Sequence, residues 1–209
     1  MEEPQSLPSK FTHQALCGPQ GWAGEETLDI EASHGMAPDA RVIFYSAKSC
    51  ENNDLEAALA RVDDQNKVTG VSNANAGFES QETTGDIVAE EQVVLQGEIQ
   101  GISFLFSSGD DGDELLSSGI KQTDYPSSDP FVTSVGGTST AIDASGKLAW
   151  QTGWGTHKFI LSANGKSWQP FATPSFLYGS GGGFSDLFPR PAYQNGIVSG
   201  GAPSGRAVP

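Results

Sequence analysis

The stretch of sequence that decides the fold is Ile102-Ser103-Phe104-Leu105-Phe106-Ser107, which leads into Ser108-Gly109-Asp110. Its short apolar run predicts a buried β-strand. The residues just before it, 84–100, have the apolar spacing of a helix, with Thr83 or Thr84 as the N-cap. A helix that leads directly into a buried strand is typical of a parallel α/β sheet.

The same alternation extends to both sides of this pair. Upstream, the apolar spacing predicts a helix at 24–36, a buried strand at 41–46, a helix at 53–64 and a short strand at 67–73. Downstream, a turn leads into a short strand at 131–135, and residues 141–180 read as hairpins or long loops. We therefore expect an α/β fold, a parallel β-sheet flanked by helices, formed by one partial domain over residues 1–209.

Composition narrows the classes of partner. The 209 residues include 26 Gly and 12 Pro, which indicates a loop-rich globular protein. The net charge of −15 argues against nucleic acid and anionic membranes as partners, because both are polyanions. No segment approaches the roughly 20 apolar residues that a membrane-spanning helix needs. Such acidity fits a protein that works at low pH, where carboxylates are protonated and repel each other less.

Three acidic residues are candidates for a site built on carboxyl groups. Glu25 and Asp29 lie four residues apart on a predicted helix, so both side chains point the same way one turn apart. Taken alone, this pair could also be part of a solvated helix face. Asp110 follows the buried strand, and in parallel sheets the sites lie beyond the carboxyl ends of the strands. Together the three residues indicate an active site that runs on carboxylates.

The chain has two cysteines, Cys17 and Cys50, on either side of the segment that carries Glu25 and Asp29. A disulfide between them would close a loop and stabilise the fold by roughly 3 to 4 kcal/mol. It would also indicate an oxidising compartment. The alternative is two unrelated free thiols.

Four segments carry a family resemblance: Gly24-Glu25-Glu26-Thr27-Leu28-Asp29-Ile30-Glu31, Ser108-Gly109-Asp110, residues 125–139 (YPSSDPFVTSVGGTS) and residues 180–191 (SGGGFSDLFPRP). They occur in this order, and the chain resembles the sedolisins, serine-carboxyl peptidases with a subtilisin-like fold. The resemblance covers residues 17 to 209. It implies a subtilisin-like sheet that is incomplete at both ends of this chain, with the prodomain and the first strands absent.

The resemblance also implies roles. Glu25 would be the general base for a nucleophilic serine, Asp29 would orient Glu25, and Asp110 would stabilise the oxyanion. In the family the serine lies in a Gly-Thr-Ser downstream of the Gly-rich segment, so we expect it beyond Pro209, together with a calcium-binding loop. A carboxylic base suits acid pH, where a histidine would be a cation. We expect a secreted, monomeric acid endopeptidase that acts on polypeptides, a chain that is inactive without that serine, and no metal site in this chain.

Other interpretations remain open. Ser139 in Gly137-Thr138-Ser139 resembles a subtilisin nucleophile that could use His34, although its position directly after the oxyanion segment favours a structural role. The acidic run 110–114 lacks the ligand spacing of an EF-hand. Residues 74–76 are Ala-Asn-Ala where the family usually has Ser followed by an aromatic residue and Gly. This departure permits a secreted, non-catalytic binding module with the same fold.

Overall fold

The structure is a computed structural model that describes residues 22–170, 175–199 and 201–209. The chain forms two compact units, each made from two stretches of sequence. The first contains residues up to 74 and residues 83–104, and the second contains residues 75–82 and 105–209.

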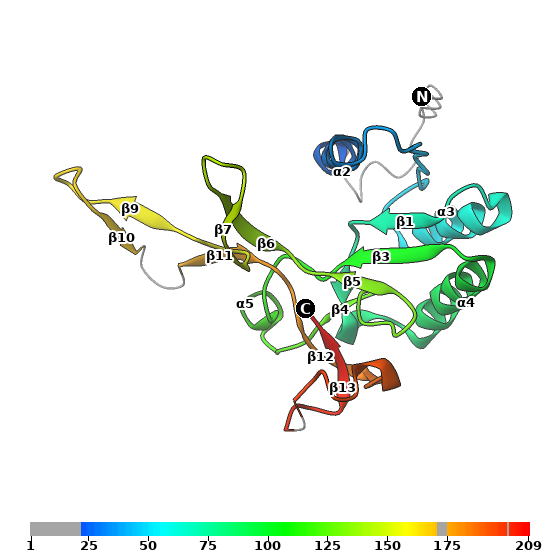
Figure 1. Cartoon of the computed structure of the whole chain (residues 1–209). Helices are drawn as coiled ribbons and strands as arrows, with labels where there is room; N and C mark the ends of the chain where they lie inside the picture. The colour runs from blue at the N-terminus through cyan, green and yellow to red at the C-terminus, as the bar shows by residue number, and fades with distance from the viewer. Residues whose placement is uncertain (1–21, 171–174, 200) are drawn as a thin grey trace. The chain divides into compact units, whose positions relative to one another are not determined.

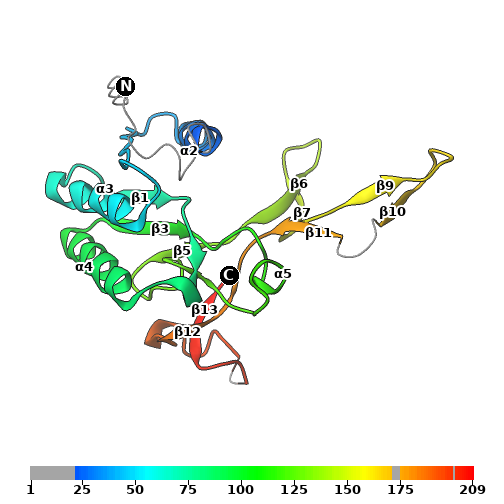
Figure 2. The same ribbon diagram turned by 180° about the vertical axis from the view of Figure 1, so that it is seen from behind.

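The first unit is built mainly from helices: α2 (Ala23–Met36), α3 (Asn52–Gln65) and α4 (Thr84–Gln100). The helices α3 and α4 pack side by side, as Figures 1 and 2 show from opposite directions. The N-cap of α4 is Thr83, whose hydroxyl accepts a hydrogen bond from the backbone N–H of Asp86 at 3.2 Å. Val62 and Val94 are fully buried and contribute to the core of this unit.

The strands β1 (Gly70–Asn73), β3 (Ser103–Ser107) and β5 (Thr133–Val135) form a three-stranded sheet in the order β1-β3-β5. The pairing of β3 with β5 is parallel, with Leu105 opposite Thr133. Alternate residues of β3, Phe104 and Phe106, are completely buried. The expected α/β fold with a parallel sheet is therefore confirmed, and the apolar run before Ser108 is its central strand.

The second unit consists largely of short antiparallel pairs. The predicted hairpins over 141–180 are confirmed as β6 (Thr138–Ile142) with β7 (Leu148–Gly153), β8 (Gly155–His157) with β11 (Phe176–Gly179), and β9 (Phe159–Leu161) with β10 (Trp168–Pro170). The remaining elements are β2 (Gly77–Phe78) with β4 (Asp124–Tyr125), β12 (Gly183–Pro189) with β13 (Gly205–Val208), the short helix α5 (Leu115–Ser118) and the 3₁₀ turns η1 (Glu79–Gln81) and η2 (Ala192–Gln194).

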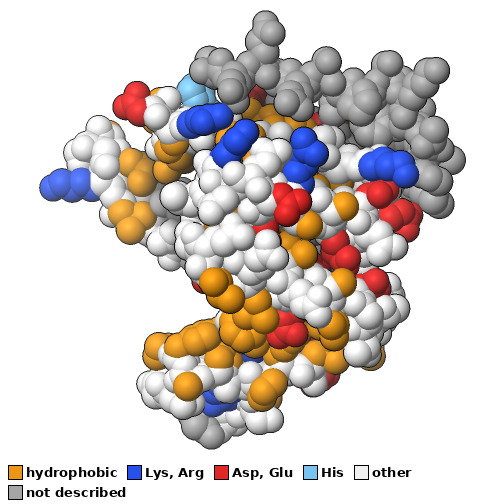
Figure 3. Space-filling model, turned by 90° about the vertical axis from the view of Figure 1, so that its right-hand side faces the viewer, with side chains coloured by type: hydrophobic (Ala, Val, Ile, Leu, Met, Phe, Trp, Pro, Cys, Tyr) orange, Lys and Arg blue, Asp and Glu red, His pale blue; other side chains and the backbone are white. Residues whose placement is uncertain are grey.

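One predicted element is wrong. Residues 41–46 were expected to form a buried strand, but they have no strand structure, and Val42 and Phe44 are each 42% exposed. An apolar run becomes a strand only when a neighbouring strand pairs with it, and none of the described strands does so. Exposed apolar side chains are not confined to residues 41–46, because Figure 3 shows hydrophobic side chains gathered at the surface in other parts of the described chain. Within the described residues, no helix has the length and hydropathy to cross a membrane.

Candidate active site

Asp110 lies on a loop at the carboxyl end of the central strand β3, and this loop is held by backbone hydrogen bonds. The N–H of Gly179 donates to the carbonyl oxygen of Asp110 at 2.6 Å, and the N–H of Gly181 donates to that of Gly109 at 2.7 Å. The N–H of Gly112 donates in turn to the carbonyl oxygen of Gly179 at 3.3 Å. The segment 179–181 therefore fixes the backbone on both sides of the Asp110 side chain.

The Gly-rich segment 181–183 is required by this close approach. A Cβ atom at Gly181 would lie 1.7 Å from the carbonyl oxygen of Ser108, so no other residue fits without moving the backbone. Gly182 and Gly183 have φ angles of +151° and +149°, a region that side chains disfavour. The glycines therefore form a tight turn with a close backbone contact.

The Asp110 carboxyl reaches solvent, yet its surroundings favour the neutral form. Partial burial among neighbouring atoms raises its pKa, and the negative charge of Asp111 raises it further. A neutral carboxyl has an O–H that can donate a hydrogen bond, whereas a carboxylate can only accept one. The side chain is therefore suited to donate to a developing negative charge under acid conditions.

A second carboxyl pair, which sequence reasoning missed, lies next to this loop. Glu114 is 2% exposed and Asp124 is 6% exposed, and their side chains are hydrogen-bonded to each other. Burial, followed by the charges of Glu114, Asp111 and Asp110, raises the pKa of Asp124 to about 7. The available signal was the position of Asp124 at the start of the Tyr125-Pro126 segment that carries the family resemblance.

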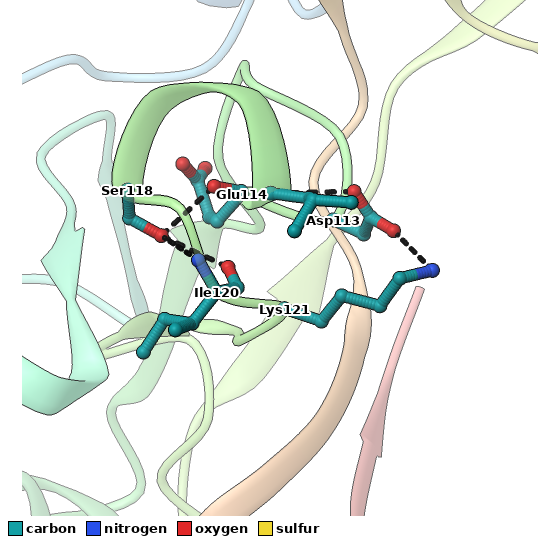
Figure 4. Close-up of polar contacts among 6 residues, drawn as sticks. Asp113, Glu114, Ser118, Ile120 and Lys121 are labelled. Carbon is teal, nitrogen blue, oxygen red and sulfur yellow. Dashed lines mark hydrogen bonds and ion pairs between the residues drawn. The ribbon is translucent and has the colours of Figure 1, made fainter.

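The short helix α5 shapes the loop around Glu114. Glu114 has a φ of +61°, and the Ser118 hydroxyl donates to its carbonyl oxygen at 2.8 Å. Lys121 closes the loop through an ion pair of 2.7 Å with the exposed Asp113, as Figure 4 shows. The side chain of Ser117 donates a short hydrogen bond to the Glu114 carboxylate. The acidic run is thus a folded turn with one buried member.

Glu25 and Asp29 lie one turn apart on α2, as predicted. The Asp29 side chain reaches solvent, while the protein atoms that partly bury it raise its pKa. The helix α2 belongs to the first unit and the Asp110 loop belongs to the second. That all three carboxyls face one site therefore stays a prediction.

The other candidates from the sequence were Ser139, His34 and the two cysteines. Ser139 lies in β6 opposite Thr152, within the hairpin with β7. His34 lies in the last turn of α2, which ends at Met36 with Ala37 as the C-cap. Cys17 lies outside the described residues, and the disulfide with Cys50 stays a prediction. Within the described ranges, no group of three acidic, His or Cys side chains is arranged to hold a metal ion.

The fold and the Asp110 loop together define an α/β protein of subtilisin-like architecture with a candidate site made of carboxyl groups. Comparison with solved structures agrees with this. The chain matches "Pseudomonas sedolisin (serine-carboxyl proteinase) complexed with two molecules of pseudo-iodotyrostatin" with a TM-score of 0.72 and 25% sequence identity. The match covers 89% of this chain and 50% of that chain.

Comparison with curated sequences gives the same family. The chain is 30% identical to kumamolisin of Bacillus sp. (strain MN-32) over 95% of its own length and 34% of the relative's. It is also 30% identical to sedolisin of Pseudomonas sp. (strain 101), over 89% and 31% respectively. No family model matches. These matches support the sedolisin family for a partial chain, which spans about a third of the length of these curated relatives.

Proposed function

We propose that the chain is part of a serine-carboxyl endopeptidase that hydrolyses peptide bonds of polypeptide substrates at acid pH. The observation that carries this proposal is Asp110, an accessible carboxyl at the end of the central strand whose surroundings raise its pKa. The similarity to proteins named kumamolisin and sedolisin supports the same reading. Secretion and a monomeric state belong to the proposal as well.

In the proposed mechanism, Glu25 accepts the proton of a nucleophilic serine, and Asp29 orients Glu25. The serine attacks the peptide carbonyl carbon and forms a tetrahedral intermediate, and the neutral Asp110 carboxyl donates a hydrogen bond to its oxyanion. Collapse of this intermediate expels the amine, which receives the proton from Glu25, and leaves an acyl-enzyme that water hydrolyses. The raised pKa of Asp110 favours this role because the carboxyl must be protonated to donate.

We place the nucleophilic serine beyond Pro209, and the 209-residue chain alone is then inactive. Family resemblance also implies a calcium ion for a segment outside this chain. Because the described residues offer no cluster suited to a metal, no step of the mechanism uses it.

The test is cleavage of a denatured protein by the protein expressed from its complete coding sequence, assayed from pH 3 to 8. We expect activity with an acid optimum. Loss of the oxyanion donor in Asp110→Ala should lower kcat by about 10² to 10³, as at other oxyanion holes. Glu25→Gln should abolish activity, whereas Glu26→Gln, a neighbouring change on the same helix, should retain it.

Three other outcomes would contradict the proposal. Activity of the 209-residue chain that is lost in Ser139→Ala would favour a subtilisin-type nucleophile. An inactive but folded full-length protein that still binds polypeptides would favour the non-catalytic module. Full activity of Asp110→Ala would remove the assigned oxyanion donor.

A further inference from the structure

The buried pair formed by Glu114 and Asp124 has no part in the mechanism above. The two side chains are 2% and 6% exposed and are hydrogen-bonded to each other. Two ionised carboxylates can only accept hydrogen bonds, so this bond exists only while the pair holds at least one proton. Removing that proton leaves two buried negative charges in contact.

The contacts indicate which carboxyl holds the proton. Burial raises the pKa of both carboxyls, and the shared hydrogen bond adds to the rise at Asp124 and opposes it at Glu114, so Asp124 donates and Glu114 accepts. Glu114 also accepts from the Ser117 hydroxyl, which suits an anion. The other Asp124 oxygen, Oδ1, is buried without a hydrogen-bond partner among the described residues, so nothing there would stabilise a charge on Asp124.

The Asp124 carboxyl also touches the loop that carries Asp110. A Cβ atom at Gly109 would lie only 1.9 Å from Asp124 Oδ2, so this oxygen packs directly against the Gly109 backbone, whose φ is +102°. The backbone of Asp124 is held independently, because its carbonyl oxygen accepts from the Ser127 hydroxyl at 2.8 Å and from the Ser128 N–H at 3.1 Å. If the pair loses its proton, the repulsion therefore acts on the loop and on the hydrogen bonds that hold it to the segment 179–181.

Within the described part of the chain, none of the charges that act on Asp124 is a cation. The charged groups that act on Asp124 are Glu114, Asp111 and Asp110, and all three are acids of the loop itself. Lys121 is bound to Asp113 at the surface. On the side of β2, the carboxylate of Glu79 accepts hydrogen bonds from the Ser185 hydroxyl and from the Asp186 N–H. The charges that act on Asp124 are therefore all negative.

We propose that Asp124 and Glu114 are positioning residues whose shared proton holds the loop of residues 108–114 closed, and that loss of this proton opens the loop and displaces Asp110. The consequence for catalysis rests on the proposed function, but the opening itself does not. Because the pKa of Asp124 is raised to about 7, the loop is closed in acid and opens as the pH rises through about 7. Between the ordinary pKa of an aspartate, about 3.9, and this raised value, closure weakens about tenfold per pH unit for one linked proton, and it levels off above about 7.

The test is hydrogen exchange of the protein expressed from its complete coding sequence, from pH 4 to 8.5, with labelling times scaled to the intrinsic exchange rate. Peptides that cover 106–124 report on the loop, and peptides from α4 are the internal reference. In Asp124→Asn the side-chain amide can donate to Glu114 at every pH, so the loop should stay protected throughout. Glu114→Gln removes the like charge and should move the opening to higher pH.

Asp113→Asn is the matched control, because it removes an exposed acid of the same loop and should open as the wild type does. The proposal is overturned if wild-type loop protection is independent of pH, or if Asp124→Asn opens with the wild-type midpoint. Cleavage measured on the same samples separates the two proposals. Peptidase activity without loop opening sinks only this inference, and loop opening in a protein without activity sinks only the proposed function.

Discussion

Asp63 is a buried acid whose charge opposes folding of the first unit. It lies on α3 with 3% exposure, and a Cβ atom at Gly97 of α4 would be 2.7 Å from its Oδ1. Neither of its carboxyl oxygens has a hydrogen-bond partner among the described residues. Burial, and to a lesser extent the charge of Asp64, raises its pKa from 3.8 to about 6. We predict that Asp63→Asn stabilises the protein at neutral pH.

The size and sign of this effect follow from proton linkage. The folded state binds the Asp63 proton more tightly than the unfolded chain does, so its contribution to stability is fully present below pH 3.8 and is lost as the pH rises through about 6. A shift from 3.8 to about 6, at about 1.4 kcal/mol per unit, amounts to roughly 3 kcal/mol. Asparagine never ionises, so it avoids this loss.

The assay is urea unfolding of the full-length protein followed by helical circular dichroism at pH 4 and pH 7.5. We expect Asp63→Asn to match the wild type at pH 4 and to exceed its unfolding free energy at pH 7.5 by roughly 2 to 3 kcal/mol. The exposed neighbour is the control, and Asp64→Asn should change stability by less than about 0.5 kcal/mol. If Asp63→Asn is less stable than the wild type at both pH values, the carboxylate makes a favourable contact and the reasoning is refuted.

Two further changes test the backbone and side-chain contacts of the second unit. Gly181→Ala should lower the free energy of unfolding by about 1 to 3 kcal/mol or more, because its Cβ would lie 1.7 Å from the Ser108 carbonyl oxygen. The control is Gly153→Ala, which should be tolerated because no atom lies within 4 Å of the added Cβ. Equal stability of the two variants in chemical unfolding would refute this. Glu79→Gln should lower the free energy of unfolding by about 1 to 3 kcal/mol, because it removes the carboxylate that accepts from the Ser185 hydroxyl and from the Asp186 N–H. An unchanged midpoint of thermal unfolding would show that these hydrogen bonds contribute nothing.

The regular elements of the first unit were predictable because their signals are local. The helix at 84–100 has its cap, its apolar spacing and its terminating glycine within its own sequence, and the structure begins and ends it at the expected residues. The central strand is equally clear, since alternate residues of the apolar run are buried. The apolar run at 41–46 gave a similar signal, but whether it forms a strand depends on a partner that the run itself does not specify.

The surroundings of Asp110 were predictable only in part. Its place after a buried strand and the close approach of the glycines at 181–183 both follow from sequence patterns, because strand ends and Gly runs have local causes. The pairing of Glu114 with Asp124 did not follow. The two residues are ten positions apart, and their contact depends on the turn through α5 and on the β2–β4 pairing, which no local pattern encodes.

The protonation of carboxyl groups is the physical variable that connects stability with the proposed chemistry. Asp63 in one unit and Asp124 in the other have pKa values raised to about 6 and about 7, so both oppose folding once they ionise. The net charge of −15 adds general repulsion in the same pH range. The two acids differ in what their neutralisation would change. Asp63 packs against α4 within the first unit, so Asp63→Asn should raise neutral stability without altering the acid optimum. Asp124 touches Gly109, so Asp124→Asn should change the loop as well as the stability, and only this variant should extend activity toward neutral pH.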